Sequence, residues 1–286
     1  MAIFSNRRAA LKVALAAVAV AATFSLSACA APSEEAAESS ANTLATIVDG
    51  KLTIGTGIPA YEPWVVGDKP ESGEGYEAAV AYAVAAELGF AADDVVWVRT
   101  SFDEAIAPGP KNFDFNLQQY SITDERKANI DFSTPYYETA QTVITIAGSP
   151  AAKATSIADL KGLVIGAATG TTSFSAIESV IAPTAGAKAF NSNDDAKAAL
   201  ASGQIDALVV DLPTALYLTA VELDGGKIVG QLAGAASGDS FGLVLDKGSK
   251  LTAAVSAAVD TLRDNGTLAA LAEKWLAGFA GAPVLK

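Results

Sequence analysis

One arginine stands in a segment rich in small polar residues, which makes it a candidate for binding an anion. The segment from Ser121 to Tyr137 reads SITDERKANIDFSTPYY and contains Arg126. A guanidinium is planar and carries five N–H donors, so it can bind a carboxylate through two parallel hydrogen bonds. An arginine beside Asp, Glu and Lys is also typical of a solvated surface. The residue type alone therefore leaves both interpretations open.

The composition excludes several classes of catalytic site. The chain contains no histidine and one cysteine, so a Ser-His-Asp triad, a Cys-His pair and a histidine-ligated zinc site cannot form. The acid pairs Asp93-Asp94 and Asp194-Asp195 stand where helices or strands are expected to begin, and acids there commonly cap a helix or face water. No P-loop or Gly-x-Gly-x-x-Gly sequence stands at a strand-to-helix junction, so nothing indicates a nucleotide. We expect no catalytic residues, no metal and no cofactor.

The amino terminus has the pattern of a lipoprotein signal peptide. Arg7, Arg8 and Lys12 precede an uncharged run, residues 13–28, which ends in Leu-Ser-Ala directly before Cys29. That run of 16 residues is shorter than the roughly 20 that a helix needs to cross a bilayer, which favours a signal peptide, residues 1–28, over a permanent span. Cleavage would expose Cys29, the only cysteine, for lipidation. The paired arginines leave general secretion and twin-arginine export both open.

The rest of the chain is acidic and long enough to bury a substantial core. Its formal net charge of −13 becomes −16 once the three cations of residues 1–28 are removed, which disfavours nucleic acid as a partner. Residues 29–43 are rich in Ala, Ser and Glu, and this composition predicts a flexible tether. Because one cysteine allows no internal disulfide, the folded part must be stabilised by packing.

Beyond the tether, apolar strand patterns alternate with helical ones. Predicted strands occupy residues 51–55, 95–99, 163–167 and 205–210, and predicted helices occupy 77–88, a segment from about 172, 194–202 and 250–276, the last divided at Gly266. Ser156 and Asp159 form a predicted capping pair. The continuous apolar run at 205–210 is typical of a parallel sheet. This alternation predicts an α/β fold.

The segment around Arg126 resembles a signature of the extracellular solute-binding proteins, family 3, of amino-acid ABC importers. In that family a Thr-x-x-Arg unit precedes an Asp-Phe-Ser-x-Pro-Tyr run; Thr123 and Arg126 supply the first here and residues 131–136 the second. The resemblance covers roughly residues 44–280. It implies a two-lobed periplasmic-binding-protein (type II) fold with a ligand cleft between the lobes and a two-strand hinge. The implied bounds are 44–142 plus 239–286 for lobe one and 143–238 for lobe two, with crossings near 141–145 and 238–242.

The same resemblance implies residues for the α-carboxylate of an amino acid. Arg126 would bind it from lobe one, with Ser121 and Thr123 supplying further donors. Thr171 and Thr172 would meet it from lobe two with backbone amides at the positive end of a helix. A Gly-Thr-Thr triplet also caps helices that bind nothing, so the triplet alone is a weak signal.

The α-ammonium would be bound by Asp211, which follows the apolar strand at 205–210. The residues alone equally allow Asp211 to cap a helix that begins near Pro213. The two roles are compatible. One charge of the zwitterion would then be bound by each lobe, so that the ligand would favour the closed form.

Four further residues are implied for the ligand's side chain. Tyr61 or Trp64 would cover it, although large aromatic residues mostly pack in the core. Gln119 and Glu77 occupy places that touch the side chain in relatives, and the Gln119 amide could equally be satisfied by backbone groups. Gly57 stands where relatives that bind basic amino acids often have an acid, which argues against Lys, Arg or ornithine.

The predicted function is an extracytoplasmic, membrane-anchored binding lipoprotein. It would bind a polar amino acid as a monomer and deliver it to the transmembrane subunits of an ABC permease, with the lipid on Cys29 holding it at the cell membrane. The alternative is an enzyme on the same scaffold that is similar to cyclohexadienyl or arogenate dehydratases. Such an enzyme needs a general acid, and Glu77 is the only candidate in the cleft.

Overall fold

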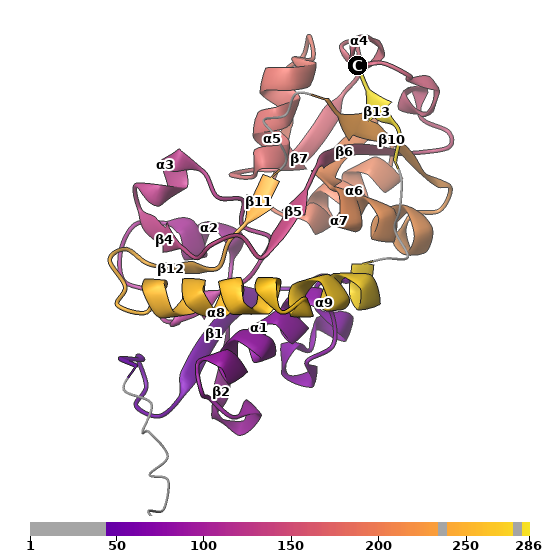
Figure 1. Cartoon of the computed structure of the whole chain (residues 1–286). Helices are drawn as coiled ribbons and strands as arrows, with labels where there is room; N and C mark the ends of the chain where they lie inside the picture. The colour runs from indigo at the N-terminus through magenta and orange to yellow at the C-terminus, as the bar shows by residue number, and fades with distance from the viewer. Residues whose placement is uncertain (1–43, 234–238, 277–281) are drawn as a thin grey trace, which may run out of the picture. The chain divides into compact units, whose positions relative to one another are not determined.

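Strands and helices alternate along the chain as the sequence pattern predicts. The computed structural model describes residues 44–233, 239–276 and 282–286 (Figure 1). The predicted signal peptide, the tether and Cys29 therefore lie outside the described residues. No helix within the described ranges is long and apolar enough to cross a membrane.

The first sheet carries most of the predicted lobe one. Its strand order is β2 (Val95–Thr100), β1 (Leu52–Gly57), β3 (Phe115–Asn116), β12 (Val244–Asp246) and β4 (Ile130–Phe132). β1 is parallel to β2 and β3, whereas β12 is antiparallel to β3 and β4. Leu52 and Ile54 of β1 are fully buried against helices α1 (Tyr76–Glu87), α8 (Thr252–Asp264) and α9 (Thr267–Leu276). The shorter helix α2 (Phe102–Ile106) belongs to a separate apolar cluster with Val244 and Ile130.

Helix α1 begins at a position that only glycine fits. Gly75 precedes it with φ +101°, and a Cβ there would lie 2.4 Å from the backbone oxygen of Trp64. The left-handed φ and the close backbone approach both require glycine. The start of α1 is thereby pressed onto the loop that carries Trp64, and Glu77 in the first turn is buried.

The second sheet carries the predicted lobe two. Its order is β13 (Val284–Leu285), β10 (Gly226–Leu232), β6 (Gln141–Ile146), β9 (Ala207–Asp211), β7 (Ile165–Ala168) and β8 (Lys188–Phe190). β9 is parallel to β7 and antiparallel to β6. Successive side chains of a strand point to opposite faces, and β9 packs accordingly. Val209 joins the cluster with α4 (Ile157–Leu160) and α5 (Thr172–Ala176), and Leu208 joins the one with α6 (Asn193–Ala201) and α7 (Leu212–Tyr217).

A short antiparallel ladder joins the segments that cross between the two sheets. It consists of β5 (Tyr137–Thr139) and β11 (Asp239–Phe241). The first crossing therefore comes before residue 141, because 141–146 is already strand β6 of the second sheet. The chain end also returns to the second sheet, where β13 pairs with β10, although the predicted bounds give residue 286 to lobe one. Below, lobe one and lobe two denote the first and second sheets with their helices.

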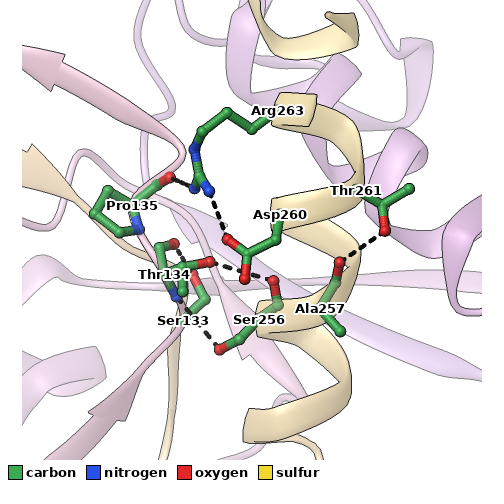
Figure 2. Close-up of polar contacts among 8 residues, drawn as sticks. All are labelled: Ser133, Thr134, Pro135, Ser256, Ala257, Asp260, Thr261 and Arg263. Atoms are coloured by element: carbon green, nitrogen blue, oxygen red, sulfur yellow. Dashed lines mark hydrogen bonds and ion pairs between the residues drawn. The ribbon is translucent and has the colours of Figure 1, made fainter. Parts of the chain in front are cut away.

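Helix α8 forms hydrogen bonds with Thr134 and Pro135, the residues that lead into β5 (Figure 2). The backbone N–H of Thr134 donates to Ser256 Oγ at 3.3 Å, and the Thr134 hydroxyl donates to the backbone oxygen of Ser256 at 3.2 Å. Arg263 donates to the backbone oxygen of Pro135 and pairs with Asp260. These contacts fix the polypeptide on the lobe-one side of the crossing.

Candidate functional site

A cavity of about 130 Å³ is lined by residues from both lobes. It is smaller than the ~300–1,000 Å³ of drug-sized sites, so it suits a small metabolite. Of the residues predicted to bind a ligand, the cavity wall contains Tyr61, Gln119, Ser121, Arg126, Thr171, Thr172 and Asp211. The other three, Glu77, Trp64 and Thr123, do not line it.

Arg126 lies at the cavity with its guanidinium fixed by both lobes. It is in helix α3 (Asp124–Lys127), and it donates to the backbone oxygen of Ser121 at 2.6 Å and to that of Gly170, in lobe two, at 2.9 Å. Its Cζ lies 5.3 Å from the centre of the Phe102 ring. Burial lowers the pKa of Arg126, an effect opposed by nearby acids. Only about two of its five N–H donors are thus used, which leaves others for an anion.

Thr123 acts on the arginine from outside the cavity. Its hydroxyl oxygen accepts the backbone N–H of Arg126 at 3.2 Å and so caps helix α3. Thr123 does not line the cavity, and its contact with a ligand stays a prediction. Its side chain fixes the turn on which Arg126 stands.

The turn between β7 and α5 brings hydroxyl groups to the opposite wall. Gly170 has φ +71°, a conformation that favours glycine, and its carbonyl faces Arg126. Thr171 caps α5 by accepting the N–H of Phe174 at 3.1 Å. The Thr172 hydroxyl lies 3.1 Å from Ser121 Oγ across the lobes. The helix start and the arginine therefore face the same space.

Asp211 ends β9 and directly precedes α7, but its side chain does not cap that helix. Instead its carboxylate accepts Gln141 Nε2 at 3.0 Å. The same amide nitrogen donates to Asp239, which also accepts the Thr172 hydroxyl at 2.7 Å. Burial raises the pKa of Asp211 well above its usual range, and the charge of Asp239 adds to this. Two acids therefore meet at one amide, and a cation would relieve their repulsion.

Asp239 was not predicted from the sequence. It lies in β11, the second crossing strand, and no local pattern marks it. Next to it, the buried Gln141 Oε1 has no hydrogen-bond partner among the described residues. Together with the two carboxylates, this oxygen makes a set of acceptors without enough donors.

Glu77 lies behind the cavity wall rather than in it. It is 2% exposed, and its two carboxylate oxygens accept the backbone N–H of Gln119 at 2.8 Å and the Gln119 side-chain amide. The Tyr136 hydroxyl also donates to Glu77. The expectation that Glu77 touches a ligand is not met, because Gln119 stands between them. Glu77, the residue predicted as the general acid of a dehydratase, therefore does not line the cavity.

Trp64 belongs to the core instead of covering the cavity. Its ring is fully buried and packs edge-to-face against Tyr76, Tyr137 and Phe241. Its Nε1 donates to Thr214 Oγ1 of lobe two at 3.0 Å. Of the two aromatic candidates, only Tyr61 lines the cavity.

Several cavity residues were missed. Phe102 and Asp103 come from the start of α2, and Asn191, Ser192 and Asn193 come from the β8–α6 turn. All stand at strand ends, where α/β sheets form their ligand sites. This general rule could have found them, but their residue types carry no specific signal. The acid pairs have the structural roles expected of them, since Asp94 pairs with Lys51 and Asp194 with Lys197.

The two lobes, their crossing strands and the charged cavity between them define a two-lobed binding protein with a type II fold. Comparison with known families gives the same result. A model of the bacterial extracellular solute-binding proteins, family 3, matches residues 52–278. The chain belongs to this family.

Its relatives are named as amino-acid-binding proteins. The chain is 34% identical to the L-arginine-binding protein of Pseudomonas aeruginosa over 188 residues, which cover 63% of this chain and 71% of the relative. It is 31% identical to the L-cystine-binding protein TcyJ of Escherichia coli, covering 74% and 76%. Among solved structures, an ancestral arginine-binding protein bound to glutamine aligns with a TM-score of 0.67 and 32% identity, covering 80% of this chain and 98% of that one. These relatives are binding proteins rather than enzymes, as the sequence predicts for this chain.

Proposed function

We propose that this protein is the extracytoplasmic binding lipoprotein of an ABC importer and binds a polar amino acid as a zwitterion between its lobes. The observation that carries the proposal is the separation of charge in the cavity. Arg126 lies on one wall and Asp211 on another, and Gln141 links Asp211 to Asp239 behind that wall. An amino acid has one charge of each sign at a fixed short distance, so it can satisfy both.

The α-carboxylate would bind Arg126 and the start of α5. A buried guanidinium and the N-terminal amides of a helix both favour an anion. Arg126 is already fixed by the carbonyls of Ser121 and Gly170, so binding would cost little further ordering. Thr171 and Thr172 at the start of α5 support this assignment because they line the same cavity.

The α-ammonium would bind the acceptors at the crossing strands. It carries three N–H donors, and it would meet the carboxylates of Asp211 and Asp239 and the unpartnered oxygen of Gln141. The positive charge would also relieve the repulsion between the two acids. Tyr61 and Gln119 line the remaining wall and would contact the side chain.

Delivery to a permease would follow from closure of the lobes around the ligand. The hydrogen bonds of Ser121 with Thr172 and of Trp64 with Thr214 join the two lobes, so they can form only when the lobes meet. A ligand that touches both lobes binds the closed form more tightly. The lipid on Cys29 would hold the protein beside the permease.

The test is ligand binding by the full-length chain purified in a mild detergent. Isothermal titration with the twenty standard amino acids and cystine should find at least one that binds, and Arg126→Ala should abolish its binding. A ligand at 100 times its dissociation constant should also stabilise the native state by about 2.7 kcal/mol. Absence of binding by every amino acid, or equal binding by the variant, would contradict the proposal.

A further inference from the structure

Gln118 and Gln119 are adjacent residues on the lobe-one wall of the cavity. Hydrogen bonds fix the orientation of both side-chain amides, so that, within the part of the chain that the structure describes, one offers a free N–H donor and the other a free carbonyl oxygen. For Gln119, the amide nitrogen donates to Glu77, which also accepts the backbone N–H of the same residue. Burial raises the pKa of Glu77 to about 7, so its carboxylate is ionised at about pH 8 and only accepts hydrogen bonds. At that pH, where the titrations below are made, this contact commits the nitrogen of Gln119 to Glu77. The Gln119 carbonyl oxygen has no hydrogen-bond partner among the described residues and belongs to a side chain that lines the cavity.

The backbone of Gln119 adopts an uncommon conformation at this place. Its φ is +51°, which is uncommon for a residue with a side chain. Such backbone strain is often found at ligand sites, where the surrounding contacts hold it in place. Here the two hydrogen bonds to Glu77 are the contacts that hold it.

Gln118 is fixed in the opposite sense. Its carbonyl oxygen accepts the hydroxyl of Tyr120 at 2.9 Å. Burial raises the pKa of Tyr120 well above its usual range, so this hydroxyl keeps its proton and remains a donor. The amide nitrogen of Gln118 is left without a partner in the described part of the chain. A Cβ on Gly57 would lie 2.8 Å from that nitrogen, so glycine at 57 leaves it the room that it occupies.

We propose that the ligand's side chain ends in a primary carboxamide, with its C=O accepting from Gln118 Nε2 and its NH₂ donating to Gln119 Oε1. This inference rests on the proposed function. A carboxylate in the same place would face the Gln119 oxygen with no proton to donate. A guanidinium or ammonium would offer no acceptor to Gln118. An unmatched polar group in a closed site lowers affinity by roughly 10- to 100-fold.

A cationic side chain is the strongest competitor, because the carboxylate of Asp103 also lines the cavity. The test is therefore titration of the full-length chain in detergent with glutamine, asparagine, glutamate, aspartate and arginine. We expect glutamine or asparagine to bind tightest, at least tenfold more tightly than its matching acid. Tighter binding of arginine, or of any other amino acid without an amide, would overturn this inference and leave amino-acid binding intact. Failure of these five to bind would overturn this inference, and failure of all twenty standard amino acids and cystine would overturn the proposed function as well.

Two variants test the role of the fixed polarity. Glu77→Gln gives residue 77 an N–H donor that can reach Gln119 Oε1, so the Gln119 amide can turn over and the ratio of amide to acid affinity should fall at least fivefold. Gln119→Met removes the oxygen that accepts the ligand's NH₂ and opposes a carboxylate, so it should lower that ratio similarly. The control is Glu87→Gln, an exposed position on the same helix, which should keep the wild-type ratio.

The measured quantity is the ratio of the affinity for the amide ligand to the affinity for the matching acid. If Glu77 had only a structural role, its replacement would weaken the binding of both ligands equally and leave this ratio unchanged. Gln119→Met keeps the inference testable should Glu77→Gln fail to fold. An amide preference that survives in a folded form of either variant would overturn the assignment.

Discussion

Glu77 gives the sharpest stability prediction of the molecule. Burial raises the pKa of its carboxyl from 4.5 to about 7, although hydrogen bonds from Tyr136 and Gln119 favour the ionised form. At ~1.36 kcal/mol for each pKa unit, the difference corresponds to about 3 kcal/mol. Replacing Glu77 by Gln keeps the size of the side chain and removes its titration, so this energy should disappear from the pH dependence of folding.

The sign of the effect follows from proton binding. Because the native pKa exceeds the unfolded one, the native state binds more protons between pH 4.5 and about 7, and the free energy of unfolding falls as the pH rises through that range. The contribution is fully present below the unfolded pKa and lost above the native one. Charged or titratable neighbours are Tyr76, Tyr120, Tyr136 and Asp211. The tyrosines remain neutral in this range. The charge of Glu77 raises the pKa of Asp211, so part of the difference between the two proteins comes from Asp211.

The assay is urea unfolding of wild type and Glu77→Gln over a pH series from about 4.5 to 8.5. The variant should gain about 3 kcal/mol relative to wild type between the two ends of the series. Glu87→Gln, which changes an exposed acid of the same helix, should run parallel to wild type. A difference between wild type and Glu77→Gln that stays constant over the whole series would refute the reasoning.

Three further predictions concern the charged walls and the contact between lobes. Arg126→Lys should weaken the best amino-acid ligand at least ~30-fold in calorimetric titration, because one ammonium cannot bind the two carbonyls that fix the guanidinium and also a carboxylate in bidentate fashion. Asp211→Asn should weaken the same ligand similarly but raise the thermal midpoint of the unliganded protein, because it removes one of two acids, Asp211 and Asp239, that repel each other. Trp64→Phe keeps an aromatic ring in the core but loses the hydrogen bond to Thr214 of lobe two. Ligand affinity should fall about fivefold, corresponding to ~1 kcal/mol. An unchanged affinity would contradict the idea that this hydrogen bond stabilises the closed, ligand-bound form.

The parts of the site that the sequence predicted are those with local signals. Arg126 stands one short turn after a capping threonine, Thr172 begins a helix after a buried strand, and Asp211 ends an apolar strand. Parallel strands present their carboxyl ends at one edge, so strand ends alone bring such residues to one cleft. The strand and helix order was predictable for the same reason, since it depends on apolar periodicity and on Gly, Ser and Asp at element ends.

The residues that were misjudged depend on contacts between distant parts of the chain. Trp64 stands in a loop, as a residue covering a ligand would, but its ring is enclosed by aromatic residues from two other segments and its Nε1 binds Thr214, 150 residues away. Glu77 is directed away from the cavity because Gln119, 42 residues later, lies over it. No sequence pattern identifies Thr214 or Gln119 as a partner of these residues. The sequence therefore could not show whether Trp64 and Glu77 are buried or line the cleft.

Asp239 shows most clearly why the remaining part of the site escapes sequence reasoning, and also what that part contributes. Its carboxylate meets Asp211 only because Gln141, the first residue of β6, lies between the crossing strand β11 and the end of β9. The two acids thus belong to different segments that meet where the lobes join. We infer that without a cation their repulsion opposes the closed arrangement, and that the ammonium of the ligand removes it. A ligand shifts the equilibrium between open and closed forms only as far as it binds one form more tightly than the other. Because the acid pair lies where the lobes join, the positive charge of the ligand contributes to its tighter binding of the closed form.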